Sequence, residues 1–147
     1  MNVEVTMDFN LAKINLDLSK ELNTIGQIIK KDHYQRLESG QGVKGGMQQL
    51  RSSTIKKKGH SKILVDTGKM RNLVVEKATK ANQMVEIHPG RKERYKGSNV
   101  TMSDVGGFHQ SGAGNLPKRE WFGITKDVEK RAIKDIELSI EQEINRA

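Results

Sequence analysis

The tripeptide Asp66-Thr67-Gly68 follows the apolar run Ile63-Leu64-Val65 and is the closest approach to a catalytic motif in this sequence. An Asp-Thr-Gly at such a place can supply one carboxylate of an aspartic protease, in which two carboxylates share a proton. A chain with a single copy would have to work as a homodimer. Lys69 follows where a small residue is expected, and the two long helices predicted below do not suit an all-β protease. The sequence therefore favours a turn, in which Asp66 bonds local amides and Gly68 takes a positive φ. The protease stays an alternative.

Other catalytic and metal-binding patterns are incomplete. Gly68-Lys69 could end a phosphate-binding loop, but position 63 is Ile instead of Gly, and Met70 stands where Ser or Thr would hold magnesium. The chain has no cysteine, which excludes disulfides, zinc thiolates and thiol nucleophiles. The histidines lack the spacing of metal ligands; they are His33, His60, His88 and His109. We therefore predict no catalytic residue, no metal and no cofactor.

The net charge of +8 is concentrated in two segments. The first, about 40–62, contains no acidic residue, and the second, about 89–98, contains only Glu93. Their basic residues are Lys44, Arg51, Lys56, Lys57, Lys58 and Lys62 in the first segment and Arg91, Lys92, Arg94 and Lys96 in the second. We predict two basic loops, of which the first is mobile until a partner orders it. They contact either DNA phosphates or an acidic protein surface. No aromatic residue interleaves with Lys56–Lys58, which disfavours stacking on single strands.

Hydrophobic periodicity predicts the helices and strands to which these loops are connected. It indicates a single α+β domain, 1–147, with an antiparallel β-sheet packed with a long N-terminal helix and a C-terminal helix, and with long basic loops. Alternation over 3–11 indicates a strand, and apolar residues at helical spacing indicate a helix over roughly 18–38 that stops at Gly40. Thr125 is a good N-cap for the last helix. Further extended segments are predicted at 63–65, at 73–79 with 83–88 as a hairpin, and at about 100–110.

The segment from Phe108 to Gly123 is the most distinctive part of the chain. Its glycines let the chain bend, and Pro117 stiffens it. Trp121 and Phe122 offer two large apolar surfaces just before a helix. Arg119 is placed to make a charge-assisted bond or a contact between subunits. An ordinary strand–turn–helix junction with core aromatics is the alternative.

From about Leu50 to Ala147 the chain resembles the bacteriophage virion-morphogenesis and tail-completion proteins. Their pattern has an apolar pair with Thr-Gly and a Leu-Arg-like element, a hairpin, His-x-x-Gly, Pro-x-Arg-x-aromatic-aromatic-Gly and a closing helix. The matching residues are Ile63, Leu64, Thr67, Gly68, Met70, Arg71, His109, Gly112, Pro117, Arg119, Trp121, Phe122 and Gly123. The chain departs from the pattern where Met47-Gln48-Gln49 replaces a Trp and Gly107-Phe108 replaces Tyr-Ala.

This resemblance implies a non-enzymatic virion protein that joins heads to tails. Such a protein forms a ring, commonly of about six copies, at the head–tail junction or the tail end, through heterologous contacts that close. Its partners would be other copies, neighbouring connector and tail-tube proteins, and possible genome DNA in the channel. It would be assembled in the host cytoplasm and located in the virion. No run approaches the ~20 apolar residues of a membrane span. The alternative function is a small DNA-binding protein acting through Lys56–Lys58 and Arg91–Lys96.

Overall fold

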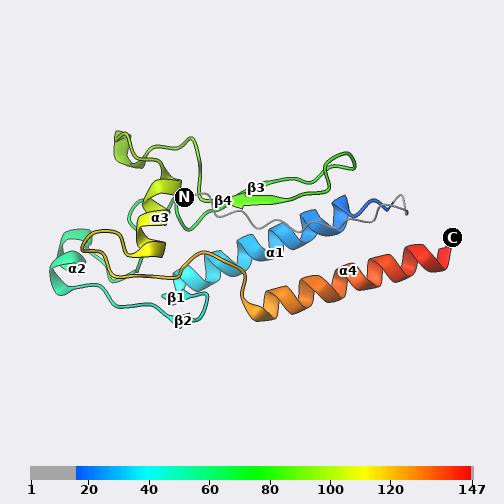
Figure 1. Cartoon of the computed structure of the whole chain (residues 1–147). Helices are drawn as coiled ribbons and strands as arrows, with labels where there is room; N and C mark the ends of the chain where they lie inside the picture. Colours follow the sequence, from blue (N-terminus) through cyan, green and yellow to red (C-terminus); the bar gives the residue numbers. More distant parts are fainter. Residues whose placement is uncertain (1–15, 147) are drawn as a thin grey trace.

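The computed structural model describes residues 16–146, and within them helices predominate over two short hairpins (Figure 1). The predicted strand over 3–11 lies outside the described residues. The combination of long helices with antiparallel strands confirms the α+β class. In chain order the elements are α1 (Ser19–Glu38), β1 (Gln41–Gly42), β2 (Gly45–Gly46), α2 (Ser52–Lys58), β3 (Val74–Glu76), β4 (Glu86–His88), the 3-10 helix η1 (Tyr95–Gly97), α3 (Met102–Ser111) and α4 (Lys126–Arg146).

Helix α1 is the central element. Its buried residues Leu22, Ile25 and Ile29 recur every three or four positions, so they share one face. Asp17 Oδ1 accepts a hydrogen bond from the Ser19 amide at 3.0 Å, which satisfies a free N–H of the first turn. The predicted helix over 18–38, followed by Gly40, is confirmed. Figure 1 shows α4 on one side of α1 and the β3–β4 hairpin on the other.

Helix α4 begins directly after the predicted N-cap. Thr125 Oγ1 accepts a hydrogen bond from the Val128 amide at 3.4 Å. The helix buries Ala132 and Ile136, and it packs along α1. The predicted C-terminal helix is confirmed.

The β-structure consists of two separate hairpins. β3 and β4 pair antiparallel with Val75 opposite Ile87, which confirms the hairpin predicted from 73–79 and 83–88. β1 and β2 pair antiparallel with Gln41 opposite Gly46. Ile87 is buried in the core, whereas Val74 is exposed. The β3–β4 hairpin therefore covers α1 with one face only.

The prediction of a structureless loop over 40–62 is wrong in part. The segment contains the β1–β2 hairpin and the helix α2. The β1–β2 hairpin is held by a backbone hydrogen bond of 2.8 Å from the Val43 amide to the Glu120 carbonyl. Helix α2 ends at Gly59, which has φ 78°. Two-residue strands and a seven-residue helix are too short to produce a recognisable hydrophobic period.

The extended segment predicted at about 100–110 is also wrong, because it is the helix α3. Thr101 and Asp104 form a capping box: Thr101 Oγ1 accepts from the Asp104 amide at 3.1 Å, and Asp104 Oδ2 accepts from the Thr101 amide at 2.9 Å. The adjacent glycines Gly106 and Gly107 weaken a helix in isolation, which hid it in the sequence. The segment 63–65, predicted to be extended, is buried but forms a turn in which Leu64 has φ 58°.

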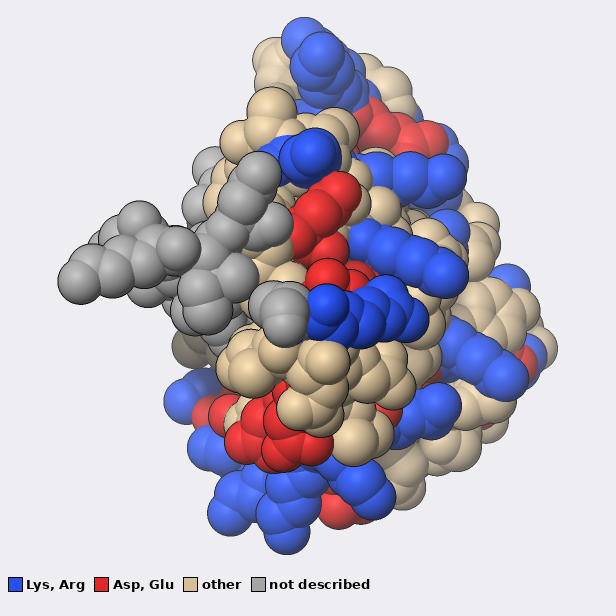
Figure 2. Space-filling view, turned by 90° about the vertical axis from the view of Figure 1, so that its right-hand side faces the viewer, with Lys and Arg blue, Asp and Glu red and all other residues tan. Residues whose placement is uncertain are grey.

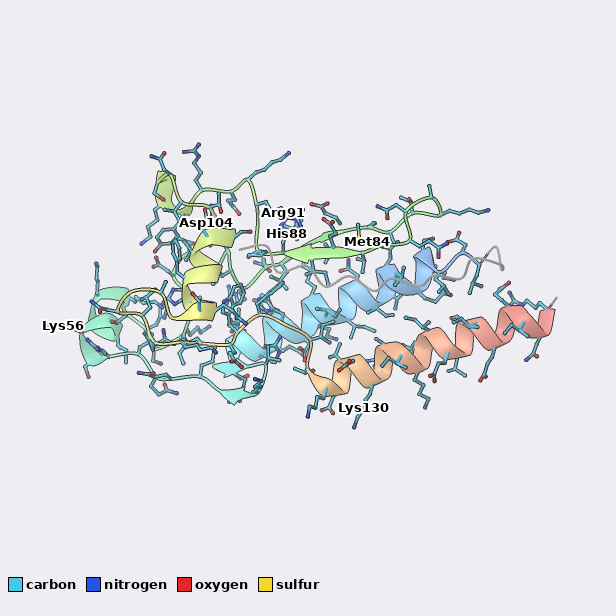
Figure 3. The ribbon with its side chains drawn as sticks, viewed as in Figure 1. Lys56, Met84, His88, Arg91, Asp104 and Lys130 are labelled. Atoms are coloured by element: carbon cyan, nitrogen blue, oxygen red, sulfur yellow. The ribbon has the colours of Figure 1, made fainter. Side chains whose placement is uncertain are left out.

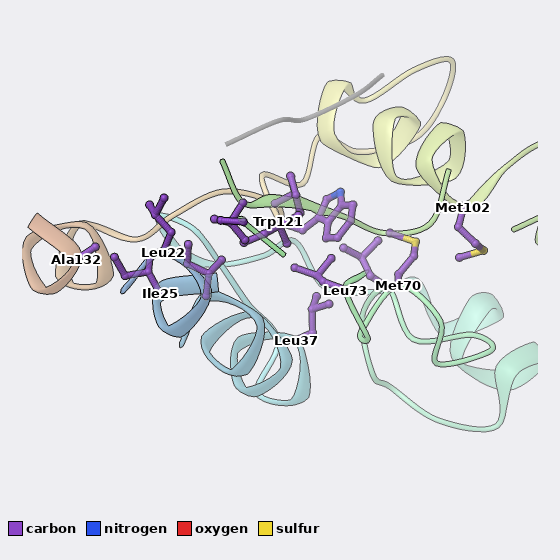
Figure 4. Close-up of a cluster of buried hydrophobic side chains, with 14 of the residues drawn as sticks. Leu22, Ile25, Leu37, Met70, Leu73, Met102, Trp121 and Ala132 are labelled. Carbon is purple, nitrogen blue, oxygen red and sulfur yellow. The ribbon is translucent and has the colours of Figure 1, made fainter. Parts of the chain in front are cut away.

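The core is continuous from α1 to the segment before α4, and Trp121 lies within it (Figure 4). Trp121 is 1% exposed, and its Nε1 donates a hydrogen bond of 2.9 Å to the Gly106 carbonyl. A Cβ on Gly106 would lie 2.5 Å from Trp121 Cζ2, so only glycine lets the indole approach α3 this closely.

Substituting Gly106→Ala should destabilise the protein by about 1–3 kcal/mol, because the added methyl forces the indole out of place. The sign of the change in unfolding free energy is informative, since Gly→Ala in a solvent-exposed helix stabilises it by up to about 1 kcal/mol. Urea unfolding measures the difference. Gly46→Ala is the control, because a Cβ there meets only the Gln41 side chain at 4.0 Å. Equal stability of Gly106→Ala and the native chain would contradict this packing.

Candidate functional site

The segment Pro117–Gly123, here called the junction, connects α3 to α4 and is held through its backbone. Gln110 Oε1 accepts hydrogen bonds from the amides of Trp121 and Phe122, at 3.0 and 3.1 Å. Gln110 Nε2 donates to the Phe122 carbonyl at 3.2 Å. One side chain of α3 thus satisfies three backbone groups of the junction.

Arg36 of α1 holds the other side of the junction. Its Nη1 donates to the Trp121 carbonyl at 3.1 Å, and its Nη2 donates to the Gly123 carbonyl at 3.3 Å. Its Nε forms an ion pair of 2.8 Å with Asp32. Arg36 was not among the residues predicted from the sequence, although it continues the buried stripe of α1 one turn after His33.

His33 packs beneath the same segment as a neutral ring. Its ring centroid lies 5.3 Å from that of Trp121 and 6.2 Å from that of Phe122. Its Nε2 lies 2.9 Å from the Met70 carbonyl, and since a carbonyl only accepts, Nε2 carries the hydrogen. Burial lowers the pKa of His33 from 6.5 to about 4.

A pocket of about 850 Å³ opens beside the junction. Its walls come from α2, from the turn after Ile63, from α3 and from the chain leading to the junction. The charged, histidine and large apolar side chains along these walls include Arg51, Lys57, Lys58, Leu64, Asp66, Lys69, Met70, Lys96, Met102, His109 and Arg119.

The pocket is strongly cationic. Six lysine or arginine residues and one carboxylate, Asp66, line it. Lys96 pairs with Asp66 at 2.7 Å, and Lys69 pairs with Glu93 at 2.7 Å. The remaining cations have no carboxylate partner within residues 16–146; they are Arg51, Lys57, Lys58 and Arg119. The pocket therefore has an unbalanced positive charge suited to an anionic group.

Arg119 is the buried member of this set. It is 5% exposed, its Nε donates to the Gln48 carbonyl at 3.1 Å, and its amide donates to the His109 carbonyl at 2.8 Å. Its Nη1 and Nη2 have no hydrogen-bond partner in the described part of the chain. Burial lowers the pKa of the guanidinium, but arginine remains charged at neutral pH. The two terminal nitrogens of the planar guanidinium are thus available to bind a ligand in the pocket.

His109 lies beside Arg119 without adding charge. Burial is the largest cause that lowers the pKa of His109, and the neighbouring Arg119 and Lys58 lower it further. The ring is therefore neutral at pH 7. Its Nδ1 is buried with no partner in the described residues, so it can contribute a polar contact to a ligand.

The two predicted basic loops meet at this pocket only in part. Arg51, Lys57 and Lys58 from the first and Lys96 from the second line it. The others point elsewhere: Lys44 pairs with Glu120, Lys62 with Glu38 and Arg91 with Glu86, Arg94 bonds Asn99, and Lys56 and Lys92 are exposed. Figure 3 shows Lys56 on α2, far from Arg91 near β4.

The residues of the tail-completion pattern divide between the pocket and its support. Leu64, Thr67, Gly68, His109, Pro117 and Arg119 line the pocket. Trp121 and Phe122 are buried in the core, as the alternative interpretation of this segment expected. Gly112 ends α3 with φ 72°, and the Gly123 carbonyl accepts from Arg36.

The surroundings of Asp66 differ from the prediction. Gly68 has φ 80°, as expected of the turn. Asp66 does not bond local amides; its carboxylate pairs with Lys96 and accepts a hydrogen bond from the Tyr95 hydroxyl. These two bonds hold the pKa of Asp66 below its usual value. The Asp66 carboxylate thus has a cation and a hydroxyl as its partners, whereas an aspartic protease pairs it with a second carboxylate.

Three comparisons with known proteins returned no match: a scan with protein-family models, a search of curated proteins and a search of solved structures. Within residues 16–146 no group of three or more His, Asp or Glu side chains could hold a metal ion. None of the helices described combines the length and apolar character needed to cross a membrane.

Stability should fall as the pH is lowered from 7.5 to 5, because His33 binds a proton more readily in the unfolded chain, where its pKa is 6.5, than in the folded one, where it is about 4. Between these values of pH the loss should be about 2 kcal/mol, and it is complete only below the folded pKa. Urea unfolding at each pH measures it.

His33→Gln should remove most of this pH dependence, whereas His60→Gln should retain it. His60 accepts only a bond from the Lys62 amide and lies outside the core. A pH dependence that survives in His33→Gln would show that another group carries it.

Proposed function

We propose that this chain is a structural, non-enzymatic virion protein of a tailed bacteriophage. It forms a ring, of about six copies, at the head–tail junction or the tail end, and it is required for joining heads to tails. Its partners are other copies of itself and neighbouring connector, neck and tail-tube proteins, with genome DNA in the channel as a further partner. It is assembled in the host cytoplasm and remains in the virion.

This proposal rests on one observation: the residues of the tail-completion pattern are scattered in the sequence but lie close to the pocket and the junction in the structure. They extend from Ile63 to Gly123, yet most of them line the pocket or support the junction beside it, with Arg71, which pairs with Glu38, as an exception. Residues that matched the pattern by accident would have no reason to converge. Their convergence favours a shared structural purpose.

Exposed apolar side chains of α4 favour a role as a subunit of an assembly. Ile133, Leu138 and Ile144 are each about half exposed, at 46%, 47% and 55%. Exposed apolar side chains indicate an interface where they form a contiguous patch, and Ile133 and Ile144 share one edge of the helix with Ile140. A protein that completes a ring has such surfaces before assembly.

The alternative, a DNA-binding protein, is favoured by the four cations of the pocket that have no carboxylate partner. Each neutralised phosphate contributes about −0.9 to the slope of log K against log salt concentration, so four contacts give about −3.6. However, these cations surround a concave pocket with an apolar floor, whereas a duplex backbone needs charges along a groove or stripe.

In the phage that encodes this sequence, particles made without the protein should be filled heads and separate tails that do not join. Negative-stain electron microscopy of the lysate measures this, and the full chain supplied in trans should restore joined particles. Joined, infectious particles in the absence of the protein would contradict the proposed function.

The purified protein should bind duplex DNA only weakly at about 150 mM salt, with a Kd in the non-specific range of roughly 1–100 µM. Fluorescence anisotropy at several salt concentrations measures both affinity and slope. Binding at nanomolar Kd by a monomer or dimer, lost with a slope near −3.6, would support the DNA-binding alternative instead.

A further inference from the structure

The pocket combines cationic side chains with an apolar floor, so its ligand should have both anionic and apolar groups. Leu64, Met70 and Met102 are at least nine-tenths buried at its base. Lys57 and Lys58 stand at α2, and Arg119 offers its free Nη1 and Nη2 from the other wall. A bare phosphate would use the charges and leave the apolar floor uncovered. A polypeptide surface with carboxylates next to aliphatic side chains would use both.

Helix α4 carries a surface of that kind. Ile133, Glu137, Ile140, Glu141 and Ile144 follow one another at spacings of four, three and one, so they lie along one edge of the helix. Lys130 and Lys134 lie on the same edge nearer the helix start, so only its last part, from Glu137 to Ile144, is acidic, and this part is here called the acidic edge. Ile133 and Ile144 are exposed, and Ile140 is partly buried. Glu137 and Glu141 have no ion-pair partner in the described part of the chain. From Glu137 to Arg146 the helix has three glutamates and one arginine.

The acidic edge cannot reach the pocket of its own chain. Figure 1 shows α2 and α3 at one end of the molecule and the end of α4 at the other. Figure 2 faces this second end, and acidic side chains are visible in its lower half, with basic side chains beside them. Complementary surfaces at opposite ends of one molecule fit a heterologous contact, which generates a ring when the rotation closes.

We infer that the pocket of each copy receives the acidic edge of α4 from a neighbouring copy, so that this contact builds the ring. The inference rests on the proposed function, because it names the contact by which such a ring forms. Arg119 binds a glutamate carboxylate through its two free nitrogens, and Lys57 and Lys58 pair with a second carboxylate. Ile144 and its aliphatic neighbours cover the floor formed by Leu64, Met70 and Met102.

Charge reversal in the full chain tests this contact. Lys57→Glu/Lys58→Glu reverses the pocket, and Glu137→Lys/Glu141→Lys reverses the acidic edge. The native protein should form a closed oligomer at about 50 mM salt, whereas each double variant alone should be monomeric, with its dissociation constant raised at least about tenfold. A one-to-one mixture of the two variants should assemble again, because each reversed surface then meets its complement. Light scattering coupled to size exclusion measures the masses.

The matched control is Lys56→Glu/Lys92→Glu, which changes the net charge by the same amount as the pocket variant. Both side chains are exposed and neither lines the pocket, so this variant should assemble like the native chain. Circular dichroism checks that every variant is folded. The milder Lys57→Gln/Lys58→Gln replaces the pocket variant if the reversal prevents folding, and it should weaken assembly without abolishing it.

Assembly of either reversed variant like the native chain would overturn the inference, as would failure of the mixture to assemble or a native protein that stays monomeric at every concentration. Loss of assembly in the control together with the variants would show a general charge effect and would also overturn it. A native protein that stays monomeric would also count against the ring of the proposed function, whereas the other results concern this contact alone. The role in joining is decided separately, by whether heads and tails join without the protein.

Discussion

The rest of the structure depends on the burial of the Trp121 indole against α3. The ring fits because Gly106 has no side chain, and its N–H is satisfied by the Gly106 carbonyl at 2.9 Å. An indole N–H buried without a partner would cost about 1–3 kcal/mol. Once Trp121 is fixed, the carbonyls of Trp121 and Gly123 come within reach of Arg36, and the adjoining amides come within reach of Gln110. The relative positions of α1, α3 and the start of α4 follow from this one placement.

Two buried arginines beside this tryptophan have different consequences. All three nitrogens of the Arg36 guanidinium have a partner, namely Asp32 and two backbone carbonyls, so this residue holds the structure together. Within residues 16–146 the Arg119 guanidinium donates only to Gln48 through Nε, and its other two nitrogens have no partner at the pocket. Burying a cation with so few partners is unfavourable unless another group completes its bonds. The same residue type therefore stabilises the monomer at one position and favours an anionic partner at the other.

Sequence reasoning succeeded where local period and capping carry the information. The apolar stripe of Leu22, Ile25 and Ile29 and the cap at Thr125 were sufficient to place α1 and α4. It failed for α3, because Gly106 and Gly107 lower helix propensity, although the Thr101-x-x-Asp104 capping box was a readable signal. It failed for Arg36, since a charged residue near the end of a buried stripe is ordinarily taken as exposed. The sequence identified the basic residues of the candidate site, but it did not indicate which of them lie together in one pocket.

The sequence by itself determined the two long helices, the β3–β4 hairpin and the concentration of positive charge in two segments, because each of these is encoded within a few neighbouring residues. Only the tertiary structure decided that Lys57, Lys58, Lys96 and Arg119 share a pocket while Lys44, Lys62 and Arg91 are neutralised by glutamates. The partners of Lys44 and Lys62 lie tens of residues away in the chain. Which carboxylate each lysine meets depends on how the junction packs against α1 and α3, and no local periodicity records that packing.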